Sequence, residues 1–312
     1  MRIITDHHLA RAVISSDGFS AYSLADSYRA LGQHLGHDFG PVISLFDRLP
    51  TFLDGEAHRE ARRALAHSMS RNKAEQVDAA RNFLTTFGAT KLQPGSCFDL
   101  LEDLAQPLYR AISSAGSPSA WLATEGFDLV EDLALLFSPA TSLKKRFGIN
   151  RRLADFTSRH GTTASHELGL LMLGIRPLTG SLALSLYDVL AQHPDAPLSA
   201  MVWPARLAHS ALSYVDRICE RPTIINEEHF EPGEHIRCVI QSPDWSAEQR
   251  QAVMFGAGAH ACLGRPLSDL VWTMSAACFA AHDHGVAVEP LRMRHDSDPF
   301  DLPARTMVTI LA

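Results

Sequence analysis

The chain has 312 residues, of which 46% are hydrophobic and 20% charged, so it is long enough to bury a large core. Its net charge of −7, with no basic cluster, argues against nucleic acid as a partner. The sequence shows no apolar run of the roughly 20 residues that span a bilayer, and its N-terminus lacks the apolar core of a signal peptide. Five cysteines without a Cys-x-x-Cys pair indicate reduced thiols. We therefore expect a cytoplasmic protein that binds neither nucleic acid nor membrane.

The first fifty residues predict a strand, a short helix and a loop-rich segment. The strand is expected over Arg2 to Thr5 and the helix over His8 to Ser15. Residues 21–50 hold three glycines and two prolines, which favour turns, so we expect loops there. These loops are expected to form one wall of a pocket.

An arginine-rich helix is expected next, over Glu56 to Arg71. Alanines and a leucine form one face of this stretch and charged residues the other. His58 and Arg62 are four residues apart, so they project from the same face one turn apart. Taken alone, this pair is equally typical of a solvated helix face.

The middle of the chain predicts mostly helix. Residues 109–163 are expected to form several interrupted helices, and Ala164 to Gln192 one long helix. The near-uniform apolar character of that long helix argues for burial through the domain centre. Arg176 and Pro177 interrupt its apolar run, and we expect the proline to kink the helix because it removes a backbone hydrogen bond.

Short strands and a small sheet are expected in the last third of the chain. Residues 223–241 alternate as short strands around a turn, and His235 to Ile240 is the clearest of them. Residues 285–312 are expected to form a small sheet. Together with the helices, these elements predict a mainly α fold with a small β portion.

The most constrained stretch runs from Phe255 to Gly264 and reads Phe-Gly-Ala-Gly-Ala-His-Ala-Cys-Leu-Gly. Its three glycines permit a tight backbone course, because glycine tolerates positive φ and close approach. A helix is expected from there to about Ala281, so Cys262 lies in a loop just before a helix N-terminus, where a thiolate is favoured. A thiolate in a rigid loop with one open face suits the iron of a haem. A structural cysteine after an ordinary turn is the alternative.

The spacing Phe-Gly-x-Gly-x-His-x-Cys-x-Gly resembles, without a gap, the haem-binding loop of the cytochromes P450. The resemblance covers nearly the whole chain: His58 and Arg62 resemble a pair on the family's C-helix, and residues 164–192 resemble its I helix. It implies one cytochrome P450-like haem-binding domain over residues 1–312. This domain is expected to be truncated at the N-terminus and in the F/G region, which roofs the substrate pocket.

The resemblance also implies the cofactor and the residues that bind it. The cofactor is haem b, iron protoporphyrin IX, with Cys262 as the ligand of its iron. His58, Arg62 and His260 are expected to hold the haem propionates. The other cofactor-binding positions that the resemblance implies are Phe255, Gly256, Gly258 and Gly264.

The chain departs from the family in the long helix. Family monooxygenases place there an acid and a threonine that relay protons, whereas this chain has Arg176 and Pro177, with Thr179 two positions too far along. The Arg-Pro pair resembles the fatty-acid peroxygenases that use hydrogen peroxide. In that branch the arginine binds the substrate carboxylate, which replaces the missing acid–base groups. Alternatively, Arg176 reaches solvent or a structural acid.

A second departure concerns the family's K helix and its Glu-x-x-Arg motif. A helix is expected over Ala208 to Arg217, in which Arg217 is the motif's arginine and Tyr214 replaces its glutamate. A phenol can accept a hydrogen bond from the arginine but cannot neutralise it. The nearest candidate for a further propionate-binding arginine is Arg221.

The leading hypothesis is a cytochrome P450-type oxidoreductase, a monooxygenase or peroxygenase that oxidises a small, carboxylate-bearing organic substrate. Arg176 and Pro177 are its expected catalytic residues. The oxidant is hydrogen peroxide, or the electrons come from a ferredoxin-type donor. The alternatives are a degenerate scaffold or partner protein without catalysis, and a haem-dependent rearrangement or dehydration that needs no oxidant.

Overall fold

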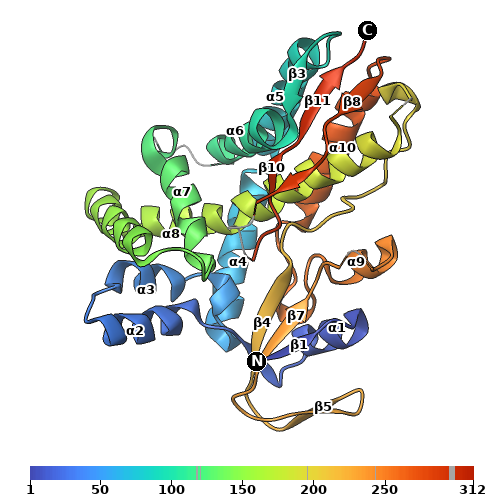
Figure 1. Cartoon of the computed structure of the whole chain (residues 1–312). Helices are drawn as coiled ribbons and strands as arrows, with labels where there is room; N and C mark the ends of the chain where they lie inside the picture. The colour runs from blue at the N-terminus through green and yellow to red at the C-terminus, as the bar shows by residue number, and fades with distance from the viewer. Residues whose placement is uncertain (117–118, 120, 195, 243, 295–298) are drawn as a thin grey trace. The chain divides into compact units, whose positions relative to one another are not determined.

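The protein is described by a computed structural model that covers every residue except 117–118, 120, 195, 243 and 295–298 (Figure 1). Its contacts divide the chain into two compact units. Unit 1 comprises Met1–Ser68, Thr124–Leu173 and Leu212–Leu263. Unit 2 comprises Met69–Ala123, Gly174–Ala211 and Gly264–Ala312. The single haem-binding domain expected over residues 1–312 stays a prediction.

Unit 1 combines short helices with most of the strands that precede the cysteine loop. Its helices are α1 (His7–Ser15), α2 (Leu24–Leu35), α3 (Gly40–Phe46), η1 (Pro50–Phe52), most of α4 (Gly55–Arg71), α7 (Phe127–Ala134), η4 (Leu135–Phe137), α9 (Ala247–Val253) and η6 (Gly258–His260). Its strands are β1 (Arg2–Ile4), β2 (Phe19–Ala21), β4 (Tyr214–Cys219), β5 (Thr223–Ile225), β6 (Glu228–Phe230) and β7 (His235–Val239). The helix expected at 8–15, the helix expected at 56–71 and the strands expected at 2–5 and 223–241 are therefore confirmed.

The core of unit 1 lies between a four-stranded sheet and helix α1. The strand order is β1-β7-β4-β2, with β1 parallel to β7 and the other pairs antiparallel. Helix α1 begins after Asp6, whose carboxylate accepts a hydrogen bond from the backbone N–H of Leu9, and it buries Val13 and Ile14. These side chains belong to one apolar cluster with Ile236 and Val253, so the sheet, α1 and α9 share a core.

The prediction of loops over residues 21–50 is wrong, because most of this segment is helical. Ser23 caps α2 by accepting a hydrogen bond from the N–H of Asp26, and Gly36 ends the helix in the left-handed conformation. Pro41 lies in the first turn of α3, where its missing N–H costs nothing. The glycine and the proline therefore mark helix ends rather than a long loop.

The helix expected over Ala208 to Arg217 is also wrong. Residues 214–219 form strand β4, which pairs with β7 on one side and β2 on the other. Arg217 lies opposite Ile236 of β7 and Ala21 of β2. The stretch is rich in β-branched and aromatic residues, and pairing along both edges provides hydrogen bonds for its backbone N–H and C=O groups. Arg217 therefore lies on a strand, and the comparison with the helical Glu-x-x-Arg motif of the family fails here.

The longest helix, α8 (Leu143–Gln192), joins the two units and is longer than the expected 164–192. Its single non-helical residue is Gly161, with φ 84° and ψ 171°, so two helices meet there. Pro177 lies inside the second of them and keeps helical backbone angles. The pronounced break is therefore at Gly161, not at the proline.

Unit 2 packs helices against a three-stranded sheet. Its helices are α5 (Lys73–Lys91), the π-helix η2 (Leu100–Ala105), α6 (Gln106–Gly116), η5 (Leu198–Ala200), α10 (Arg265–Ala280) and the second half of α8; η3 (Leu122–Gly126) begins in it. Its strands are β3 (Cys97–Asp99), β8 (Val286–Val288), β9 (Arg292–Met293), β10 (Pro303–Arg305) and β11 (Met307–Ile310). The sheet has the order β3-β11-β8, and Figure 1 shows α5 and α6 beside β3 and β11. Phe87, Phe98 and Phe279 bring α5, β3 and α10 into one aromatic cluster.

The mainly α fold with a small β portion is confirmed. Within the part of the chain that the structure describes, one helix, α8, is long and apolar enough to cross a membrane by length and composition. In the most apolar 18-residue stretch of this helix, 67% is buried inside the structure.

Candidate functional site

The cysteine loop folds back on itself between α9 and α10. The N–H of Cys262 donates to the carbonyl of Phe255 at 2.7 Å, and the N–H of Gly256 donates to the carbonyl of Val253 at 2.8 Å. Gly256 and Gly258 have φ of 67° and 62°, which side-chain-bearing residues rarely adopt. A Cβ on Gly258 would also lie 2.9 Å from the Cα of Ser15. The loop is therefore fixed by backbone hydrogen bonds and by contact with α1.

This loop presents the thiol of Cys262 at the surface. Cys262 and Cys97 are exposed, whereas Cys219 and Cys238 are buried. Among the described residues, no group of three or more His, Cys, Asp or Glu side chains could hold a metal ion.

Two histidines connect the cysteine loop to helix α4. The rings of His58 and His260 stack with their centroids 4.0 Å apart. His260 Nε2 lies 3.1 Å from Asp54 Oδ1, and Asp54 Oδ2 accepts the N–H of Ala21 at 3.0 Å. The carboxylate of Asp54 thus ties His260, two residues before Cys262, to strand β2.

His58 has an exposed fraction of only 3%, and its Nε2 is buried without a hydrogen-bond partner. Burial, and then the charges of His260 and Arg62, lower its pKa from 6.5 to about 4. A buried polar atom without a partner is costly, and a carboxylate oxygen would satisfy it.

Two arginines add positive charge around this histidine. Arg62, half-buried one turn after His58, makes no hydrogen bond or ion pair within the described part of the chain. Arg217 on β4 is 7% exposed and donates from Nη1 to the carbonyl of Asp216 at 2.9 Å. Its charge lowers the pKa values of both His58 and Asp54.

The structure therefore brings together three predicted residues, His58, Arg62 and His260, and one that the sequence reasoning missed. The pair His58 and His260 is in contact, and Arg217 is an electrostatic neighbour of His58 and of Asp54. Arg217 was expected in a helix. In the structure it pairs across β2 and β4 with Ala21, whose N–H donates to Asp54, and this pairing places Arg217 near Asp54. Arg221 does not join them, because its guanidinium pairs with Asp17 at 2.7 Å.

This cluster fits the propionate of a haem. It offers imidazole and guanidinium donors with one carboxylate, and its unpartnered buried nitrogen is of the kind that binds an acid oxygen. The cofactor-binding residues expected from the sequence lie in unit 1, except Gly264, which is the N-cap residue of α10 in unit 2.

Arg176 and Pro177 lie in unit 2, on the second half of α8. Arg176 is 6% exposed, and its guanidinium carbon lies 5.9 Å from the centroid of the Phe300 ring. The hydroxyl of Thr179 donates to the carbonyl of Ile175 at 2.7 Å. This threonine is thus engaged with the backbone of its own helix.

No protein-family model matches the sequence, and no curated protein matches it. Solved structures with similar folds include cytochromes P450. P450BioI, in complex with an acyl carrier protein ligated to hexadec-9Z-enoic acid, is 15% identical, with a TM-score of 0.74 over 99% of this chain and 92% of that chain. A thermophilic cytochrome P450 from Sulfolobus tokodaii is 18% identical, with a TM-score of 0.67 over 99% and 94%. CYP109B1 from Bacillus subtilis is 15% identical, with a TM-score of 0.63 over 98% and 92%.

At these identities the similarity establishes the fold. The chain has the cytochrome P450 fold, as the resemblance of its cysteine loop predicts.

Proposed function

We propose that the protein is a haem-thiolate oxidoreductase of the cytochrome P450 type. The observation that carries this proposal is the contact of His58 with His260, which joins a buried, unpartnered nitrogen to the loop that exposes Cys262. Cys262 binds the iron of haem b, and His58, His260, Arg62 and Arg217 hold its propionates. A haem with a thiolate ligand favours cleavage of an O–O bond when bound.

The rest of the loop positions the thiolate. The hydrogen bond from Cys262 N–H to the carbonyl of Phe255 fixes the cysteine backbone. Gly256 and Gly258 hold the turn without side chains, and Gly264 leads into α10. A ligand fixed in this way needs little reorganisation when it binds.

The test is the absorption spectrum of the haemin-loaded protein, reduced and exposed to carbon monoxide. We expect a strongly red-shifted Soret band in the native protein and its loss in Cys262→Ser. The exposed Cys97 is the matched control, so Cys97→Ser should keep the band. If the native protein bound no haem, it would instead be a scaffold or partner protein.

We further propose that Arg176 anchors the carboxylate of a small organic substrate. Its burial beside Phe300 and its position just before Pro177 support this role, since a guanidinium binds a carboxylate through two parallel hydrogen bonds. Binding of a carboxylic acid and of the matching alcohol to the haem-loaded protein should be compared. Arg176→Lys should weaken binding of the acid about tenfold and leave the alcohol within about twofold. Equal losses for both ligands would contradict the anchor.

We propose hydrogen peroxide as the oxidant. Pro177 provides no hydroxyl, and the hydroxyl of Thr179 donates to the backbone, so neither residue supplies the usual proton relay. Turnover with peroxide should therefore exceed turnover with a ferredoxin and its reductase; the reverse result would favour an electron-chain monooxygenase. The five cysteines are free thiols, which supports a cytoplasmic location.

A further inference from the structure

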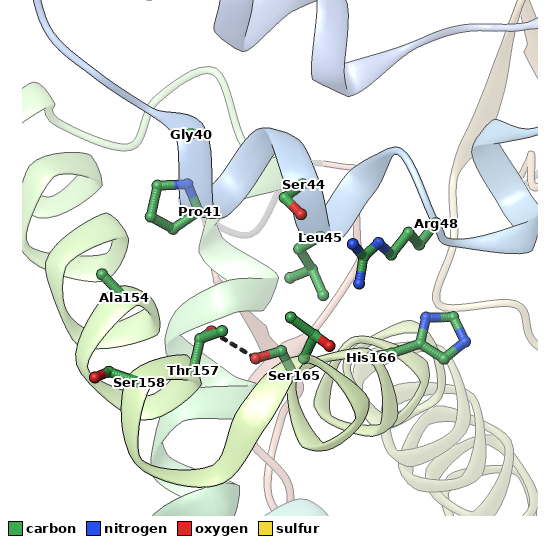
Figure 2. Close-up of a pocket in the computed structure, with 11 residues that line it drawn as sticks. Gly40, Pro41, Ser44, Leu45, Arg48, Ala154, Thr157, Ser158, Ser165 and His166 are labelled. Atoms are coloured by element: carbon green, nitrogen blue, oxygen red, sulfur yellow. Dashed lines mark hydrogen bonds between the residues drawn. The ribbon is translucent and has the colours of Figure 1, made fainter.

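A cavity lies in unit 1, between helix α3 and the part of α8 around Gly161 (Figure 2). Its volume is about 370 Å³, within the range of small-molecule pockets. No residue of the cysteine loop and no member of the His58 cluster lines it.

The bend at Gly161 builds this cavity. Because the backbone there is non-helical, residues on both sides of the bend face the same space, among them Thr157 before it and Thr162 after it. The hydroxyls of Thr157 and Ser165 lie 2.5 Å apart and join the two helical segments (Figure 2). An L-residue would be strained at this φ of 84°, so the glycine is needed.

The opposite wall is one face of α3. Pro41, Ser44, Leu45 and Arg48 are spaced as one stripe along the helix and its C-terminal extension. The lining is thus a mixture of apolar groups and hydroxyls. Among the described residues, no carboxylate lines the cavity.

Arg48 and His166 lie near each other in the cavity, and Arg48 brings a positive charge to it (Figure 2). The side chain of Arg48 makes no hydrogen bond or ion pair to any described residue, and the neighbouring carboxylate of Asp47 is already paired with Arg29. His166 Nδ1 is buried without a partner. Burial and the charge of Arg48 lower the pKa of His166, so the neutral form of its imidazole is favoured.

We propose that this cavity binds a small organic anion whose neutral part carries hydroxyl groups. Arg48 would hold the carboxylate or phosphate head through two hydrogen bonds, with His166 Nδ1 as a further partner. The hydroxyls of Ser44 and Thr162, which make no hydrogen bond to described residues, would bind the hydroxylated part. This site is separate from the residues that we assign to haem.

The test is isothermal titration of the full-length protein with gluconate, glycerol 3-phosphate and, as the uncharged control, glycerol. We expect saturable binding of one or both anions and none of glycerol; the anion that binds shows whether the head group is a carboxylate or a phosphate. Arg48→Gln should weaken binding about tenfold. The exposed Arg151 on α8 does not line the cavity, so Arg151→Gln should leave the affinity within about twofold.

A second variant separates binding in the cavity from attraction to surface charge. Ser44→Trp keeps Arg48 but fills the space beside it, and it should abolish binding. Arg48 and Ser44 are exposed, so both variants should fold, which circular dichroism would verify. No heat with either anion at about 50 mM, or unchanged affinity in Arg48→Gln or Ser44→Trp, would overturn the proposal.

Discussion

The rings of His58 and His260 stack 4.0 Å apart, although 202 positions separate the two residues in the sequence. One ring comes from helix α4 and the other from the loop that carries Cys262. The Asp54 carboxylate lies beside His260 but leaves the Nε2 of His58 without a partner. The pair is therefore a fixed platform with one nitrogen left for a ligand.

The burial of His58 predicts a pH-dependent stability of the haem-free protein. Its pKa is about 4 in the folded protein and near 6.5 when the chain is unfolded. Between these values the unfolded chain holds a proton that the folded protein lacks, so the free energy of unfolding falls as the pH falls from about 6.5 to 4. This difference corresponds to at most about 3 kcal/mol.

Urea unfolding at several pH values would measure this contribution. His58→Gln should show a shallower decline with pH than the native protein. His67 is exposed on the same helix, so His67→Gln should follow the native profile. Parallel profiles for the native protein and His58→Gln would contradict the assignment.

Gly258→Ala should destabilise the protein more than a comparable glycine substitution elsewhere. At a φ of 62°, alanine costs about 1 to 2 kcal/mol, and its Cβ would also meet Ser15 Cα at 2.9 Å. Gly36 has a φ of 61°, but a Cβ at this position would have nothing within 4 Å, so Gly36→Ala shows the cost of the backbone angle alone. Equal losses of unfolding free energy would show that contact with α1 does not hold the loop.

The sequence predicted the local features of the site better than its long-range contacts. The turn at the glycines of the cysteine loop and the shared helix face of His58 and Arg62 follow from spacing, because tight turns and helix faces are set by residues close in the chain. The role of His58 was expected only from the family resemblance. Arg217 was missed because its place depends on β4 pairing with β2 nearly 200 residues away. Residues 21–50 were mistaken for loops because glycine and proline mark helix ends as well as turns.

Arg217, found only in the structure, should contribute to haem binding. Its charge disfavours protonation of His58, so Arg217→Gln should raise the pKa of His58, measured by NMR of the imidazole protons. The same variant should weaken haem binding about tenfold, because a buried guanidinium is a strong donor to a carboxylate. Arg221→Gln is the control, since Arg221 pairs with Asp17 on the surface. An unchanged His58 pKa together with unchanged haem affinity would remove Arg217 from the site.

Thiol reactivity provides a test that needs no substrate. In the haem-free protein we expect a maleimide to react quickly with Cys97 and Cys262, the two exposed cysteines. Burial raises the pKa of Cys278 to about 11 and that of Cys238 to about 12, so these thiols should react slowly in the folded protein. Loading with haemin should protect Cys262 and leave Cys97 reactive, because a thiolate bound to iron no longer attacks the reagent. Mass spectrometry of the labelled peptides would distinguish the two, and undiminished labelling of Cys262 in the haem-loaded protein would show that another residue binds the iron.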